Sequence, residues 1–184
     1  MTVVFVRIVT APLVVAAALV LAGCQGTTSA APTPVQSTDL TSSDGGFDQH
    51  AVIGVVLAPG EDALGGELRA GLAHAGFRPD VRVAPAQGPA AAQRAAVDGL
   101  VRSGAKALLV RAVDPSSLRG VVQTAHDAGV VVVALGEPVP TNGTGGDGVS
   151  ADYRVPAADD RAELVGSAVD VVGSLQRGEK PSTD

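Results

Sequence analysis

The sequence predicts an α/β lobe in which a parallel β-sheet lies between two layers of helices. Between residues 51 and 176, short apolar runs alternate with longer segments whose apolar residues recur every three or four positions. This alternation is typical of βα units, and right-handed crossovers then place helices on both faces of the sheet. Residues 51–58 and 130–135 are apolar throughout, as expected of strands that are covered on both faces.

The predicted elements follow one another in regular βα order. The strands are predicted at residues 51–58, 78–84, 107–113, 130–135 and 149–151. The helices are predicted at residues 61–75, 89–103, 114–128 and 157–175, and Gly76, Gly104 and Gly129 can end the first three in the left-handed conformation. Asp114 can cap the third helix, with Pro115 in its first turn. This order predicts one three-layer flavodoxin-like or Rossmann-like lobe with the spatial strand order 2-1-3-4-5.

A secretory signal precedes the predicted lobe. Arg7 is followed by an apolar run at residues 8–22, and the run ends in the small residues of Leu21-Ala22-Gly23-Cys24. This tetrapeptide resembles a lipobox, in which the cysteine thiolate is the nucleophile that takes up a diacylglyceryl group. We therefore expect residues 1–23 to be removed and Cys24 to carry the lipid. An uncleaved transmembrane helix at residues 3–23 is the alternative interpretation.

Residues 24–50 are expected to join the lipid to the lobe. Residues 25–50 are rich in Ser, Thr, Gly, Pro and Asp without a sustained period, so the sequence predicts a flexible tether with a span of about 25–30 Å. A short polar tail at residues 177–184 follows the lobe. The expected location is the outer face of the cell membrane, or the outer membrane if the host has one.

Composition argues against several classes of function. The net charge is −6 and no basic stripe is present, so nucleic-acid binding is not expected. Cys24 is the only cysteine, which excludes an internal disulfide or a cysteine-rich metal site. The three histidines lie in unrelated segments and no nucleophile has an adjacent base, so we expect no enzyme, no metal and no cofactor.

Other proteins with this sheet need residues that are missing here. The turn after the first strand, residues 58–60, has neither the acids of a receiver domain nor the hydroxyl-rich phosphate loop of a flavodoxin. The glycine-rich residues 143–148 precede a predicted strand rather than a helix, so they predict a surface turn and no phosphate loop.

Four segments carry a resemblance to a known family. They are IGVV at residues 53–56, GAKALLV at 104–110, AHDAGVVV at 125–132 and GVSAD at 148–152. In order and spacing they resemble the amino-terminal lobe of type 1 periplasmic sugar-binding proteins, over residues 52–175. The resemblance implies a sugar or related polar ligand and an ABC permease as partner. Only a polar tail remains where such proteins cross into a second lobe, so we expect a shortened protein or one that works with a second chain.

In open α/β sheets a ligand binds beyond the carboxyl ends of the strands, where the strand order reverses. This rule selects Asp114, Glu137 and Arg111 as ligand-binding residues, with Asp152 at the margin. The resemblance matches Asp114 and Asp152 to polar positions of the family, whereas Glu137 has no counterpart there. The alternatives are a helix cap for Asp114, a loop carboxylate for Asp152, and an ion pair of Arg111 with Asp114 or Glu137.

Two features depart from the family pattern. Residues 59–65 contain no aromatic side chain that could stack on a sugar ring, and Gly136-Glu137 replaces the Asp-Arg pair that often follows the fourth strand. The leading hypothesis is a membrane-anchored solute-binding lipoprotein. The other is a noncatalytic module that binds an envelope protein and retains a vestigial cleft.

Overall fold

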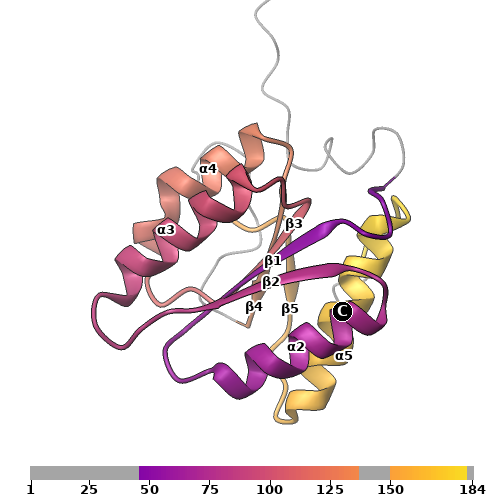
Figure 1. The fold of residues 1–184 in the computed structure, drawn as a ribbon, viewed down its shortest axis with the longest axis horizontal. Helices are drawn as coiled ribbons and strands as arrows, with labels where there is room; N and C mark the ends of the chain where they lie inside the picture. Colours follow the sequence, from indigo (N-terminus) through magenta and orange to yellow (C-terminus); the bar gives the residue numbers. More distant parts are fainter. Residues whose placement is uncertain (1–45, 137–149, 182–184) are drawn as a thin grey trace, which may run out of the picture. The chain divides into compact units, whose positions relative to one another are not determined.

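All strands of the described chain belong to one parallel sheet. The computed structural model describes residues 46–136 and 150–181, and in these ranges five strands follow the spatial order β2-β1-β3-β4-β5 (Figure 1). The strands are β1 (Val52–Leu57), β2 (Arg78–Val83), β3 (Ala107–Val110), β4 (Val131–Leu135) and β5 (Tyr153–Val155). The predicted fold class and strand order are confirmed.

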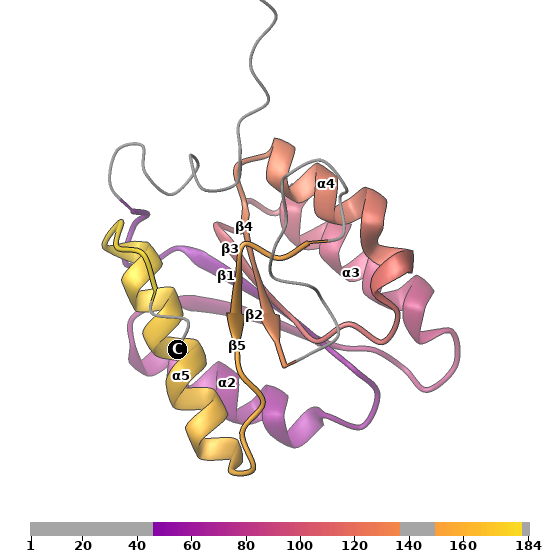
Figure 2. The same ribbon diagram turned by 180° about the vertical axis from the view of Figure 1, so that it is seen from behind.

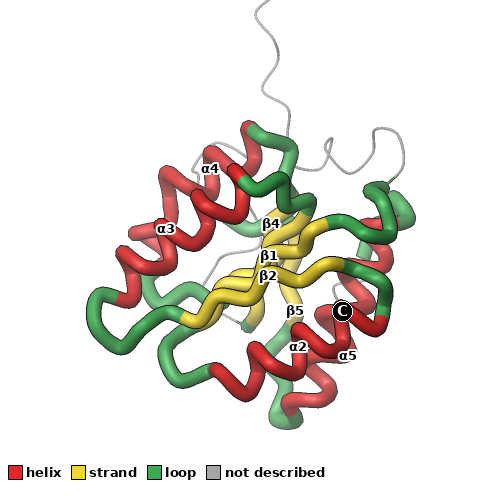
Figure 3. The backbone as a smooth tube through the Cα atoms, viewed as in Figure 1, coloured by secondary structure: helices red, strands yellow, loops and turns green. Residues whose placement is uncertain are grey.

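The helices form a layer on each face of the sheet. They are α2 (Asp62–His74), α3 (Pro89–Arg102), the 3₁₀ turn η1 (Pro115–Leu118), α4 (Arg119–Asp127) and α5 (Arg161–Gln176). Helices α2 and α5 cover one face, and α3 and α4 cover the other, as the two opposite views and the backbone tube show (Figures 1, 2 and 3). None of the helices in the described ranges has the length and apolarity that crossing a bilayer requires.

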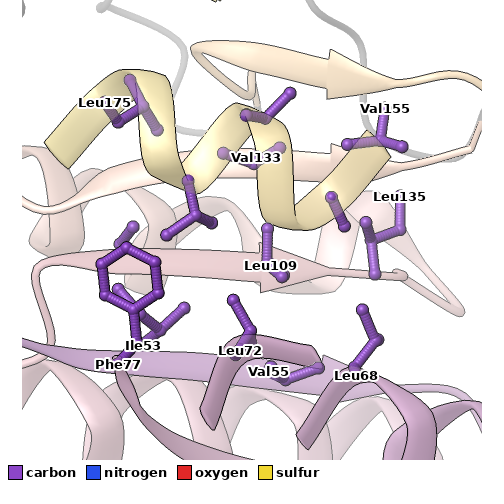
Figure 4. Close-up of a cluster of buried hydrophobic side chains, with 14 of the residues drawn as sticks. Ile53, Val55, Leu68, Leu72, Phe77, Leu109, Val133, Leu135, Val155 and Leu175 are labelled. Carbon is purple, nitrogen blue, oxygen red and sulfur yellow. The ribbon is translucent and has the colours of Figure 1, made fainter. Parts of the chain in front are cut away.

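Two aliphatic cores lie on opposite faces of the sheet. Ile53 and Val55 of β1 point into the core under α2 and α5, together with Leu109 of β3 (Figure 4). Leu57 belongs to the same core. Val56 belongs to the core under α3 and α4. Because successive side chains of a strand point to opposite faces, the continuous apolar run of β1 supplies both cores.

The fifth strand differs from the prediction. Residues 150 and 151 form no strand, and β5 begins at Tyr153, whose Cα pairs with that of Val133. Tyr153 and Val155 are buried whereas Arg154 between them is half-buried. Buried and more exposed side chains thus alternate, as in a strand at the edge of a sheet, and the strand is not a continuous apolar run. As a result, Asp152 precedes β5 instead of following the fifth strand.

Two further boundaries differ by three residues or more, and the helix predicted at residues 114–128 is divided into η1 and α4. Helix α5 begins at Arg161 rather than at residue 157, because the Asp160 carboxylate accepts a hydrogen bond of 3.0 Å from the Ala162 amide and so caps the helix. Strand β3 ends at Val110, which places Arg111 in the loop that follows the strand.

Replacing Gly66 with alanine is expected to stabilise the lobe. Gly66 is exposed inside α2, and a Cβ at this position meets no atom within 4 Å. Alanine loses less conformational entropy than glycine on folding into a helix, so the free energy of unfolding should rise by about 0.5–1 kcal/mol in urea denaturation. The control is Gly54→Ala in β1, whose Cβ would lie 2.5 Å from Leu108 Cδ2. That overpacking should lower the free energy of unfolding by about 1–3 kcal/mol, and a stabilising effect at Gly54 would contradict the packing described here.

Candidate functional site

The strand order reverses between β1 and β3, and the loops that leave these two strands lie side by side. The Arg111 amide donates a hydrogen bond of 2.9 Å to the carbonyl oxygen of Val56, which extends the pairing of β3 with β1 past the end of β3. Crevices at such reversal points are the common ligand-binding places of open α/β sheets. Residues 58–61 and 111–114 therefore form the candidate site.

An ion pair between Glu61 and Arg111 joins the two loops. One carboxylate oxygen of Glu61 lies 2.8 Å from Arg111 Nη1, and the other accepts a hydrogen bond of 2.8 Å from the Ala58 amide. The Glu61 side chain is only 20% exposed and that of Arg111 is 35% exposed, so the pair is partly shielded from water. The sequence predicted an ion pair of Arg111 with Asp114 or Glu137. In the part of the chain that the structure describes, which excludes Glu137, its partner is Glu61.

Asp114 caps the 3₁₀ turn that follows β3. Its carboxylate accepts hydrogen bonds from the Ser116 amide at 3.0 Å and from the Ser116 hydroxyl at 2.6 Å. The hydroxyl bond comes first among the causes that hold the pKa of the Asp114 carboxyl below its ordinary value. A lowered carboxyl pKa stabilises the fold at neutral pH, and this contribution is lost as the pH falls through the lowered value.

Asp152 lies near the amino-terminal ends of the parallel strands, opposite the candidate site. It stands immediately before β5, and one oxygen of its carboxylate accepts a hydrogen bond of 2.8 Å from the amide of Val132, near the start of β4. The same oxygen lies 3.3 Å from His126 Nε2, and both side chains are buried. Since parallel strands share one direction, Asp152 is separated from the carboxyl ends by about the length of β4, or roughly 10 Å.

The other two predicted site residues lie outside the described ranges. Glu137 follows Gly136, the last described residue after β4, and the Gly136 amide donates to the Val155 carbonyl oxygen at 2.9 Å. Cys24, with the predicted signal and most of the predicted tether, precedes Gly46, the first described residue.

Gln93 supports the candidate site from below, although it was not predicted. Its fully buried amide donates to the carbonyl oxygens of Leu57 and Arg111 at 3.1 and 2.8 Å, and its oxygen accepts from the Val113 amide at 2.9 Å. One α3 side chain thus bonds to the last residue of β1 and to the loop after β3. Its position three residues before Ala96 and seven before Leu100, on the inward face of a predicted helix, is the signal that could have identified it.

A cavity of about 280 Å³ lies beside the ion pair, between the first turns of α2 and α5. Arg111 and Arg161 line it together with Glu61 and Asp159. Val113, 44% exposed, is the only large apolar side chain exposed in the described ranges, and it lies in the same loop as Arg111 and Asp114. This mixture of guanidinium donors, carboxylate acceptors and a small apolar surface suits a neutral molecule that carries several hydroxyl groups. The described residues contain no cluster of side chains that could hold a metal ion.

Comparison with known proteins identifies the family. A family model described as a periplasmic binding protein domain matches residues 53–152, whereas no curated protein matches the sequence. A solute-binding protein of an ABC transporter from Clostridium phytofermentans with bound β-D-glucose is similar in structure at 20% identity, with a TM-score of 0.46 over 50% of this chain and 29% of that protein. One from Mycobacterium smegmatis with bound glycerol is 23% identical, with a TM-score of 0.49 over 58% and 35%.

A third solved structure, a solute-binding protein from Bacillus halodurans with bound myo-inositol, is 22% identical, with a TM-score of 0.42 over 51% of this chain and 32% of that protein. The chain thus spans about a third of the length of these proteins. The matched family segment runs from β1 to the residue before β5 and covers more than half of the 184 residues. The resemblance predicted from the sequence is confirmed, and the chain belongs to the periplasmic binding protein domain family.

Proposed function

We propose that this chain is the solute-binding lobe of a lipid-anchored protein that delivers sugars or related polyhydroxylated molecules to an ABC importer. The observation that carries the proposal is the family match over residues 53–152, on a sheet whose reversal point carries charged and hydrogen-bonding side chains. The glucose, glycerol and myo-inositol bound by the similar proteins indicate the ligand class.

The polar groups at the carboxyl ends would hold such a ligand through its hydroxyl groups. Arg111 can donate hydrogen bonds through the guanidinium nitrogens that do not face Glu61, and Asp114 has a second carboxylate oxygen that can accept them. Glu137 lies outside the described residues and enters the proposal from the sequence alone, as the second residue after β4. We leave Asp152 out of this ligand set, because its carboxylate bonds to the Val132 amide near the start of β4.

Titration of the full chain with D-glucose, glycerol and myo-inositol should show weak binding, with a Kd in the high micromolar range or weaker. The described residues form one lobe, so a ligand on the carboxyl edge keeps one side in water and its hydrogen bonds gain little from exclusion of water. The double variant Asp114→Ala, Glu137→Ala should weaken binding further in titration calorimetry. Asp170→Ala, at an exposed acid of α5, is the matched surface control and should bind as the wild type does.

Submicromolar binding by the monomeric chain, or binding that ignores the double variant, would contradict this placement of the site. A solute-binding role would also gain support from permease and ATPase genes beside the gene for this chain.

A second function is favoured by the state of the charged groups. Arg111 and Glu61 satisfy one another and Asp114 caps η1, so the polar groups of the reversal point already have partners inside the lobe. This arrangement fits a noncatalytic module that binds an envelope protein and whose own ligand cleft is vestigial. A melting temperature unchanged by any of the three ligands, with no importer genes nearby, would favour this function over solute binding.

The lipid anchor predicts the mass of the mature protein. Protein purified from the membrane of its host should begin at Cys24 and carry a diacylglyceryl group on the thiol, because the tetrapeptide at residues 21–24 follows an apolar signal. Intact-mass spectrometry before and after removal of ester-linked acyl chains measures this directly. Cys24→Ser should accumulate with residues 1–23 retained. A membrane-bound wild type that retains residues 1–23 would instead support the transmembrane alternative.

A further inference from the structure

A second recess lies at the amino-terminal edge of the sheet, away from the reversal point. Its volume is about 720 Å³. Its walls include the segment that precedes and begins β1 at residues 47–52, the first residue of β2, and the loop before β3 with Gly104 and Lys106. The last residue of α5, Gln176, closes one side, and its carbonyl oxygen accepts a hydrogen bond of 3.2 Å from the Phe47 amide.

Two basic side chains flank one strand position in this recess. Arg78 of β2 pairs with Val52 of β1 on one side, and the Lys106 amide donates to the Val52 carbonyl oxygen at 2.9 Å on the other. Their Cα atoms are thus two strand spacings apart, or about 10 Å, and the alternation of side chains places both on the same face as Val52. A long lysine and a long arginine at this separation can reach the same anionic group.

The charge of the recess is available to a ligand. Arg78 and Lys106 are both exposed, and neither forms an ion pair with another residue in the described ranges. His50 also lines the recess and Asp48 is its one acidic residue, whereas Asp80 further along β2 is paired with Arg82. Glu61 and Asp114 lie at the other end of the strands, beyond the screening length of about 8 Å at physiological salt. Asp152, at the same end as the recess, is buried beside His126 and bonds to the Val132 amide.

The recess is also the part of the lobe that lies nearest to Cys24 along the chain. The entering residues 47–52 form its wall, and residues 25–45 separate them from the predicted lipid. Even fully extended, this connection spans at most about 75 Å, so a lipidated chain holds the recess close to the bilayer at a high effective concentration.

We propose that the recess binds the phosphate groups of anionic phospholipids, so that the lobe rests on the membrane by its amino-terminal edge. The carboxyl edge with Glu61, Arg111 and Asp114 then faces away from the bilayer. This inference rests on the lipid anchor proposed above, and each basic side chain near an anionic surface strengthens binding by about fivefold.

Hydrogen exchange on the lipidated full chain tests the proposal. The protein is reconstituted in phosphatidylcholine vesicles with and without phosphatidylglycerol. Amides at residues 47–52 and 104–106 should exchange more slowly only when phosphatidylglycerol is present, and added salt should remove the effect. Arg78→Gln, Lys106→Gln should lower the ratio of docked to free lobe by about 25-fold. The control Arg94→Gln, Arg119→Gln changes the charge equally at two other exposed arginines and should keep the protection.

Three results would overturn the proposal. They are protection from exchange that does not depend on phosphatidylglycerol, an equal loss of protection in both double variants, and protection at the carboxyl ends of the strands instead. Protection that grows with protein concentration in the absence of vesicles would show a second copy in the recess and would overturn it too. The mass of the protein is measured first, so failure of the anchor is seen separately. If Cys24 carries no lipid, the same variants are compared on the unlipidated chain added to the vesicles, and equal exchange in all of them refutes the recess.

Discussion

Gln93→Leu is expected to lower the free energy of unfolding by about 2–4 kcal/mol. The substitution puts an apolar side chain of similar size in this fully buried position and removes all three hydrogen bonds of the amide. The Leu57 carbonyl oxygen keeps a bond from the Ala84 amide at 3.1 Å, whereas the Val113 amide and the Arg111 carbonyl oxygen lose the bonds that Gln93 makes. Urea denaturation followed by circular dichroism measures the difference.

The matched control is Gln123→Leu on α4. Gln123 makes only a surface hydrogen bond of 2.9 Å to Asp127, so its loss should change the free energy of unfolding by less than about 0.5 kcal/mol. Equal effects at the two glutamines would show that the Gln93 amide does not support the loops. Gln93 bonds to both sides of the reversal point. In the native state of Gln93→Leu, the amide hydrogen of Val113 should therefore exchange faster than in the wild type.

Asp152→Ala is expected to lower the free energy of unfolding by about 2–3 kcal/mol without changing ligand binding. The buried carboxylate accepts the bond from the Val132 amide and lies beside His126, so alanine removes the acceptor from the start of β4. Asp152→Asn keeps an oxygen that can accept the amide and should cost less. Thermal and urea unfolding give the stability, and calorimetry with myo-inositol gives the binding.

Asp160→Ala provides the comparison for an exposed carboxylate with a structural role. It removes the cap of α5 and should cost about 1 kcal/mol. Loss of ligand binding by Asp152→Asn at unchanged stability would reverse our interpretation and restore Asp152 to the ligand site.

The fold could be predicted because its signals are local. The runs of β1 and β4 are apolar on both faces, and Gly76, Gly104 and Gly129 end three helices with positive φ values, which few other residues tolerate. The fifth strand was misplaced because it is short and lies at the sheet edge, where Arg154 interrupts the apolar pattern. The strand was predicted at residues 149–151 just before it, but Ser150 and Ala151 form no strand.

The candidate site could be predicted only in part. Its place at the carboxyl ends of β1 and β3 follows from topology, and so does the position of Arg111. The pairing of Arg111 with Glu61 depends on how two loops meet, which single-sequence spacing does not encode. The fifth strand begins a few residues later than predicted. Asp152 therefore lies near the amino-terminal ends of the strands and not, as expected, near their carboxyl ends.

The placement of Tyr153 gives the lobe a built-in optical reporter. The chain has one tyrosine and no tryptophan, so ultraviolet fluorescence excited near 280 nm comes from this single ring. Tyr153 is 6% exposed in β5 and belongs to the core that α5 covers. The emission therefore follows the packing of the last strand against that core, while the far-ultraviolet dichroism follows all helices together. An emission midpoint below the dichroism midpoint would reveal that β5 and α5 detach before the rest of the sheet.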